Sequence, residues 1–312
     1  MATAALPVTI TAADLAGDAR RRRKERVVKT LFLAAAAVSM LVSVGIVFSV
    51  VGNAVRFLTL MHPSQLFALD WSPRSGRFGF ATLLAGTAIV SVIAMLVATP
   101  VGLGAAVFLA EYARPRVRRT LKPILEILAG IPSVVLGYFA LNVISPDVVQ
   151  RLFGSASIFN LAAAGLGVGI LVTPLVASVA EDAMFAVPGA LREAAYGLGA
   201  RRGTTSTRVV FPAATSGIVA SLILGVSRAI GETMIVAIAA GATGSAIFTL
   251  NPLHYGQTMT TAMSSLAIGT DAVGGSAAAF PSLFFVGLLL FVITFSLNLA
   301  ANGFVRRVRE RY

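Results

Sequence analysis

Four long stretches without a charged side chain dominate this sequence and limit what it can fold into. They lie between Arg77 and Glu111, Glu126 and Asp147, Arg151 and Glu181, and Asp271 and Arg306. A transmembrane helix needs about 20 mostly apolar residues, and each stretch is long enough. Since the bilayer core holds no water to satisfy open backbone groups, such stretches cross it as helices. The sequence therefore predicts an all-α, polytopic membrane protein.

About six transmembrane helices are expected, because one further apolar run follows the N-terminal tail and another run contains two charges. The predicted spans are about 30–51, 81–110, 123–143, 158–180, 213–241 and 283–304. Gly165, Gly167 and Gly169 predict that another helix approaches the fourth span closely, since small residues let membrane helices pack tightly. The predicted division of the chain is a basic tail at 1–27, a first helix and external segment at 28–80, a core at 81–305 and a basic end at 306–312.

The distribution of basic residues predicts the orientation in the membrane. Of the 25 lysines and arginines, seven lie in the tail up to Lys29, five at 114–122, four at 192–208 and four at 306–311, against four in the intervening loops. Loops rich in Lys and Arg stay in the cytoplasm. We therefore expect a multi-pass protein of the cytoplasmic (inner) membrane with both termini in the cytoplasm.

Composition also argues against several classes of function. The net charge of +12 would suggest nucleic-acid binding in a soluble protein. Here the basic residues lie at the ends of predicted helices, without interleaved aromatic residues. We therefore expect membrane lipid as a partner and no nucleic acid. Cysteine is absent, and the two histidines, His62 and His254, fall in predicted external loops. No metal site and no catalytic residues are therefore predicted. None of the three lysines follows a G-x-x-x-x-G loop, so the chain has no P-loop for ATP.

A stretch of mixed polarity between the fourth and fifth predicted spans, about 181–212, carries a regular spacing. Glu193-Ala194-Ala195 is followed after three residues by Gly199, and after nine more by Val209-Val210-Phe211-Pro212. Residues 193–198 can form a short helix, and Gly199 can end it because glycine readily adopts the left-handed conformation. Pro212 is expected to start the next span, a position that favours proline.

This spacing resembles the EAA loop of ABC importer permeases: E-A-A, three residues, Gly, nine residues, then a hydrophobic close before Pro. The resemblance implies a MetI-like permease fold. It also implies that a separate ATPase subunit is contacted by the matching residues, Glu193, Ala194, Ala195, Gly199 and Pro212. The chain would then be a non-enzymatic pore-forming subunit that binds no cofactor itself, while the partner ATPase uses ATP and Mg.

Three segments narrow the resemblance. Residues 227–234 read SRAIGETM, residues 126–137 read EILAGIPSVVLG, and residues 181–200 contain EDAM and REAAYGLGA. Together they resemble the PstC family of phosphate importer permeases over roughly residues 80–305. The related PstA permeases share R-A-x-G-E-T but usually continue with Ala-Pro, whereas Met234-Ile235-Val236 follows here; Ile235 replaces the usual Ala of PstC. The resemblance implies a PstA-like permease partner, a PstB-like ATPase dimer and a PstS-like phosphate-binding protein.

Arg228 and Glu232 are the only charges in the fifth predicted span. Each would cost about 2.5–3.5 kcal/mol at a helix centre, so such residues indicate a functional site. Their i, i+4 spacing places them on one helix face, and the planar fork of arginine suits an oxyanion. We predict that Arg228 contacts phosphate in the translocation path, that Glu232 holds Arg228 in place, and that Thr233 belongs to the same path. Glu232 could also accept a hydrogen bond from a protonated phosphate oxygen, which would disfavour fully ionised sulfate. The alternative is an interhelical ion pair that only fixes packing.

Glu126 lies about one turn inside the third predicted span, four residues after Lys122. An i, i+4 pair between these two side chains is predicted, with a gate as the alternative role. For the whole chain, three further alternatives stay open. These are a permease for molybdate, sulfate or another oxyanion, the sister PstA-type permease, and an autonomous transporter or channel. A membrane enzyme is disfavoured because no catalytic constellation is visible.

Overall fold

The computed structural model describes residues 19–241, 243–269 and 276–309. The chain divides into two compact units, Met1–Gly52 and Asn53–Tyr312. The described part of the first unit is helical and belongs to α2, Ala19–Leu60, which continues into the second unit. The predicted basic tail and basic end lie partly outside the described residues.

Helices form most of the second unit. Their bounds are α3 Phe80–Val107, α4 Pro115–Ala129, α5 Ser133–Phe139, α6 Leu161–Phe185, α7 Gly189–Gly197, α8 Arg202–Thr205, α9 Phe211–Ala213, α10 Thr215–Ile230, α11 Met234–Val236, α12 Met259–Ile268 and α14 Ala279–Arg309. π-helical turns follow α3, α5, α8 and α11, at Phe108–Tyr112, Ala140–Gln150, Ser206–Val210 and Ala237–Gly241.

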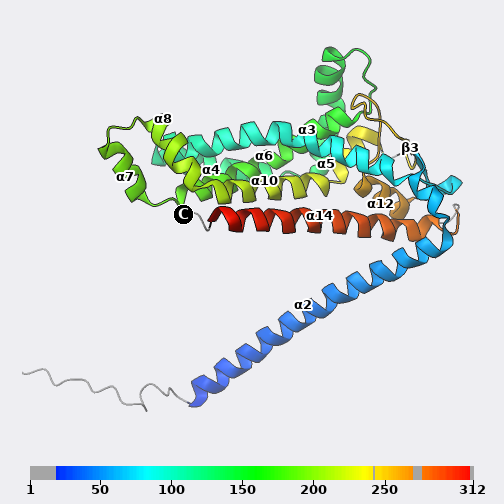
Figure 1. Ribbon diagram of the computed structural model, residues 1–312, viewed down its shortest axis with the longest axis horizontal. Coiled ribbons are helices and arrows are strands. Elements are labelled where there is room, and N and C mark those ends of the chain that lie inside the picture. Colours follow the sequence, from blue (N-terminus) through cyan, green and yellow to red (C-terminus); the bar gives the residue numbers. More distant parts are fainter. Residues whose placement is uncertain (1–18, 242, 270–275, 310–312) are drawn as a thin grey trace, which may run out of the picture. The chain divides into compact units, whose positions relative to one another are not determined.

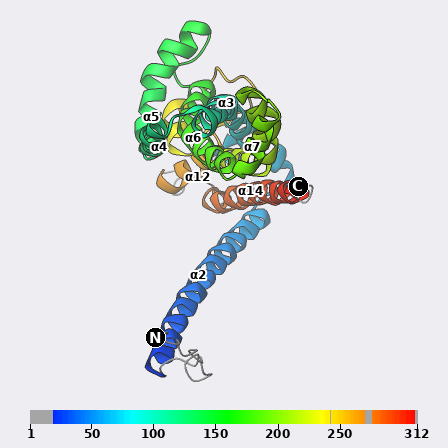
Figure 2. The ribbon, with the colours of Figure 1, turned by 90° about the vertical axis from the view of Figure 1, so that its left-hand side faces the viewer.

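Within the described residues, five helices are long and apolar enough to cross a membrane. A sixth span results if the bent pair Arg202–Ala213 and Thr215–Ile230 counts as one. The prediction of an all-α membrane protein with about six spans is therefore confirmed. Helices α3, α6, α10 and α14 lie side by side (Figures 1 and 2).

Close packing of α6 against α3 depends on the predicted glycines. A Cβ atom at Gly165 would lie 2.7 Å from Cβ of Ile93, and one at Gly169 would lie 3.0 Å from the carbonyl oxygen of Ala94. Both contacts are too short for a larger side chain unless α3 moves. The close approach predicted from the small residues is confirmed.

Two predicted spans have different bounds in the structure. The third, expected at 123–143, is Ser133–Gln150, because the chain breaks at Gly130–Pro132, where proline lacks an N–H and restricts the residue before it. The fifth, expected at 213–241, bends by 72° before Thr215 and breaks after Ile230. Pro212 therefore does not start the span. It lies in α9, before the bend.

A small antiparallel sheet, which the prediction of an all-α chain missed, covers one end of the second unit. Its order is β2-β1-β3, with β1 at Asp70–Ser72, β2 at Arg77–Phe78 and β3 at Ala246–Ile247. Trp71 of β1 pairs with Phe78 and Ala246. Strands of two or three residues give no periodicity in the sequence, which is why they were not predicted.

Aromatic side chains fill the core at the same end. Trp71 and Phe80 have ring centroids 5.4 Å apart, and Phe80 lies 4.9 Å from Phe285. Phe57 and Phe78 complete this aromatic cluster. Helix α12 packs on it through Met259, Ala262 and Leu266. Helix α12, which lies between two predicted spans, is thus partly built into the core.

Candidate functional site

Helix α7, Gly189–Gly197, contains the predicted Glu193-Ala194-Ala195 and ends as the sequence indicates. The N–H of Gly199 donates to the carbonyl of Tyr196 (2.9 Å) and that of Ala200 to the carbonyl of Ala195 (3.0 Å). Gly199 has φ +80°, so these bonds form a Schellman motif that satisfies carbonyls at the helix end. The predicted short helix and its glycine stop are confirmed.

Large apolar side chains of α7 and its cap point outward. Leu198 is 90% exposed, Leu191 and Tyr196 are also exposed, and α7 buries none of its residues. Glu193 and Ala194 are exposed as well. An exposed helix with an apolar surface is a candidate for contact with another protein.

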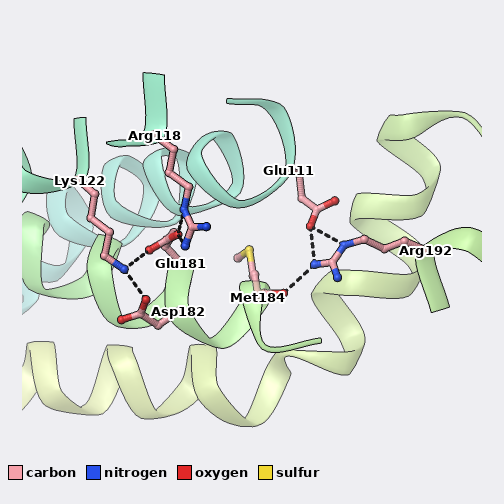
Figure 3. A network of polar contacts seen from close by, with 7 residues as sticks. All are labelled: Glu111, Arg118, Lys122, Glu181, Asp182, Met184 and Arg192. Carbon is pink, nitrogen blue, oxygen red and sulfur yellow. Dashed lines mark hydrogen bonds and ion pairs between the residues drawn. The ribbon is translucent and has the colours of Figure 1, made fainter. Parts of the chain in front are cut away.

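Arg192 connects α7 to the membrane helices (Figure 3). Its Nη2 and Nε donate to Oε1 of Glu111, at 2.9 and 3.2 Å. The same guanidinium donates to the carbonyls of Val187 (2.6 Å) and Met184 (2.8 Å) at the end of α6. Oε2 of Glu111 is 3.5 Å from the Ser206 hydroxyl, which donates to it. Because charged hydrogen bonds are stronger than neutral ones, Glu111 and Arg192 together form the main polar contact of α7.

A second set of ion pairs lies beside the first and joins α4 to α6 (Figure 3). Glu181 is fully buried and accepts from Nε of Arg118 and Nζ of Lys122, each at 2.7 Å. Lys122 also binds Asp182. Burial alone would lower the pKa of Lys122, but the hydrogen bonds to Asp182 and Glu181 outweigh it and raise this pKa. The guanidinium of Arg118 lies over the ring of Phe185, 3.7 Å from its centroid.

The predicted pair of Glu126 with Lys122 is absent from the ion pairs of the described residues, because Lys122 binds the two acids of α6 instead. Both side chains nevertheless line one cavity of about 610 Å³ between α4 and the ends of α3 and α6. The prediction from i, i+4 spacing took account only of neighbours on one helix, whereas the partners of Lys122 are about sixty residues away in the sequence.

Arg228 and Glu232 lie at the break between α10 and α11. Nη2 of Arg228 is 3.8 Å from Oε2 of Glu232, the Arg228 side chain is 55% exposed, and that of Glu232 is 5% exposed. Oε1 of Glu232 accepts from the N–H groups of Met234 (3.1 Å) and Ile235 (3.4 Å). The predicted pair of Arg228 with Glu232 is therefore present but long, and the other oxygen of the carboxylate caps α11.

Thr233 lies beside this break and lines a cavity of about 330 Å³. From α12, Thr260 and Ser264 add hydroxyl groups to the lining, and Oγ1 of Thr260 donates to the carbonyl of Glu232 (2.9 Å). The sequence analysis missed these two residues. The run of hydroxyl residues at 258–265 was the available signal, but it lies between two predicted spans, where no site was predicted.

A comparison with known families classifies the chain. The family described as the binding-protein-dependent transport system inner membrane component matches residues 98–310. The chain belongs to this family. The matched part contains α7, both sets of ion pairs and the α10–α11 break, and so covers every candidate site residue.

Two relatives illustrate the family relationship, and one solved structure illustrates the fold. The chain is 32% identical to the phosphate transport system permease protein PstC of Mesorhizobium japonicum over 89% of both chains. It is 28% identical to PstC of Xylella fastidiosa (strain 9a5c) over 94% of both. Among solved structures, a bacterial alginate ABC transporter in complex with its periplasmic protein matches 91% of this chain and 97% of its own, with a TM-score of 0.62 and 17% identity. That match supports the permease fold alone.

The sequence analysis of this family member also missed Glu111, Glu181 and Arg192 as a group. Each acid ends a long uncharged stretch, and Arg192 precedes Glu193 directly. An acid at the end of an apolar span, next to a loop rich in arginine, was the available signal. What the sequence could not give was the pairing across 81 residues between Arg192 and Glu111.

Proposed function

We propose that this chain is the pore-forming subunit of an ATP-driven importer of inorganic phosphate. The observation that carries the proposal is α7, an exposed helix of nine residues with the E-A-A spacing and a glycine stop, in a chain of this permease family. The cargo is proposed from the names of the PstC relatives. ATP and Mg are used by a separate ATPase dimer, and this chain catalyses nothing.

The proposed assembly places α7 against an ATPase. Glu193, Ala194 and Ala195 belong to the docking helix, Leu198 offers an apolar contact, and Gly199 ends the helix. Pro212 stands before the bend that leads into the membrane. In this proposal both termini and α7 lie in the cytoplasm. A PstA-like permease, a PstB-like ATPase dimer and an external PstS-like binding protein complete the complex.

The proposed substrate path passes the break between α10 and α11. The Arg228 side chain is more than half exposed in the single chain, so its guanidinium can donate hydrogen bonds to an oxyanion. Glu232 lies next to it and could accept a hydrogen bond from a protonated phosphate oxygen, which sulfate lacks. Thr233 adds a hydroxyl group to the same region. Glu126, which lines one cavity together with Lys122, is proposed as a gating residue.

Phosphate uptake by the assembled complex tests the proposal. The chain is purified with its partner permease, ATPase and binding protein, and reconstituted in proteoliposomes with ATP inside. We expect uptake of phosphate that sulfate and molybdate do not compete with. Arg228→Gln should lower uptake at least about tenfold, as expected for the loss of a charged hydrogen bond. Arg228→Lys should keep part of the activity.

The matched control is Arg151→Gln, which removes an exposed arginine whose ion-pair partner within the described residues is Asp147 at i, i+4. Its uptake should equal that of the wild-type complex. Normal phosphate uptake with both Arg228 variants would remove Arg228 from the path. Import of molybdate or sulfate in place of phosphate would overturn the proposed cargo while leaving the importer intact.

A further inference from the structure

The polar contacts that attach α7 to the membrane helices come from one side chain, Arg192. Helix α7 buries no residue, and its large apolar side chains point away from the bundle. Arg192 is its most anchored side chain, with 20% exposure and four hydrogen bonds. Besides the backbone at its two ends and its packing on α8 and on the turn at Ser206–Val210, α7 is connected to the membrane helices through Arg192.

The partners of Arg192 come from two membrane helices. Glu111, whose side chain is 3% exposed, lies in the π-helical turn that extends α3. The carbonyls of Met184 and Val187 belong to the end of α6 and the residues just after it. Helices α3 and α6 also pack against each other along their lengths. A displacement of Arg192 is therefore shared by the two helices at the centre of the bundle.

Glu111 also contacts the segment that follows α7. Its second oxygen accepts from the hydroxyl of Ser206, which begins the π-helical turn leading to the bent pair of helices. Both Glu111 and Ser206 thus lie in π-helical turns, which occur frequently at functional sites. The carboxylate of Glu111 thus connects α7, through Arg192, with the segment that leads back to the membrane helices, through Ser206.

We propose that the Arg192–Glu111 pair is the joint that transmits movement of α7 to α3 and α6. The proposal rests on the proposed function, in which α7 docks on an ATPase. Arg192 and Glu111 are positioning residues, since neither touches substrate or nucleotide. A buried pair with several charged hydrogen bonds keeps a fixed direction, so α7 moves together with the two helix ends rather than hinging at Pro188. Without the pair, α7 remains attached but moves independently.

The coupling ratio, phosphate imported per ATP hydrolysed, tests the joint in the reconstituted complex. We expect Arg192→Gln and Glu111→Gln to lower this ratio at least about tenfold, the loss of a charged hydrogen bond or more, while ATP hydrolysis continues. Arg192→Lys keeps the charge but cannot make all four bonds, so its ratio should be intermediate. Arg208→Gln, which removes an exposed arginine from the same loop, should match the wild type.

A distance measurement gives a second readout that needs no transport. The chain has no cysteine, so Ala190→Cys on α7 and Thr120→Cys on α4, both exposed, can carry spin labels in the assembled complex. The wild-type labels should give one narrow distance distribution, which stays narrow when nucleotide binds. With Arg192→Gln the distribution should broaden.

The outcomes separate the two proposals. An unchanged coupling ratio and an unchanged label distance in Arg192→Gln would overturn the joint. So would a proportional loss of uptake and ATP hydrolysis with a narrow distance, which would indicate a merely structural role. If the wild-type complex imports no phosphate, the proposed cargo fails, and the label distances still decide whether Arg192 couples α7 to the bundle.

Discussion

Helix α3 begins and ends in two different environments. Its first residue, Phe80, packs among Phe57, Trp71, Phe78 and Phe285. Just beyond its last turn, Glu111 is bound by Arg192, and the neighbouring Glu181 by Arg118 and Lys122. Burial of aromatic rings is strong but hardly directional, whereas charged hydrogen bonds need fixed geometry. The comparison indicates that hydrophobic burial stabilises one end of the bundle, while charged hydrogen bonds join specific elements at the other end.

The largest effect is expected where the aromatic end loses its most buried ring. Trp71→Ala should destabilise the protein by about 4 kcal/mol, because a fully buried tryptophan leaves a large cavity. Thermal unfolding in detergent checks this value. Trp71→Phe is the matched control. It keeps an aromatic ring, removes an indole N–H that has no hydrogen-bond partner in the described part of the chain, and should cost under about 1.5 kcal/mol. Equal losses for both variants would contradict the packing argument.

A somewhat smaller loss is expected at the charged end. Glu181→Gln removes the carboxylate shared by Arg118 and Lys122 and leaves two cations close together. Breaking a buried pair from one side costs about 3 kcal/mol, measured by the same thermal unfolding. Asp182→Asn is the control, since Asp182 is 62% exposed and exposed pairs contribute about 1 kcal/mol or less. If both substitutions had the same effect, the burial of Glu181 would be irrelevant to stability.

Gly199 offers a local test at the end of α7. Gly199→Ala meets no neighbouring atom within 4 Å, so its cost is the left-handed backbone, about 1 kcal/mol. The result should be fraying of α7, seen as faster hydrogen exchange of residues 193–198. Gly197→Ala is the matched control, because Gly197 also has no neighbouring atom and is helical. Slower or unchanged exchange in Gly199→Ala would contradict the Schellman motif as the helix stop.

The sequence predicted those features that depend on near neighbours along the chain. The uncharged stretches located α3 and α6, and the spacing from Glu193 to Gly199 predicted α7 with its stop. The pair of Arg228 with Glu232 was predicted from i, i+4 spacing, which assumes a continuous helix. The pair forms, but it is long at 3.8 Å, and because the helix breaks after Ile230 the other oxygen of the carboxylate accepts from the N–H of Met234.

Features that depend on tertiary contacts were beyond the sequence. Lys122 was paired with Glu126 on its own helix, but the acids of α6 are closer in space. Arg192 meets Glu111 across 81 residues, and β3 exists only because β1 lies beside it. The sequence shows charged residues at the ends of the spans, but it does not show their partners. The packing of α3, α4 and α6 determines which residues pair.

The smallest effect concerns the pH dependence of the charged end. Because the folded protein raises the pKa of Lys122, through its bonds to Asp182 and Glu181, this lysine contributes stability that is fully present below its unfolded pKa of about 10.4. That contribution falls as the pH rises through the higher folded value. The contribution of Lys122 to the α4–α6 contact should therefore be present in full and constant near neutral pH, and decline only above about pH 10.4. In Lys122→Arg, the guanidinium stays charged throughout this range. The free energy of unfolding of both proteins, measured between pH 9 and 11.5, should fall less in the arginine variant than in the wild type. The aromatic cluster holds no group that would cause such a difference. Identical alkaline curves would mean that Lys122 adds nothing to the contact, leaving Arg118 as the cation that holds Glu181.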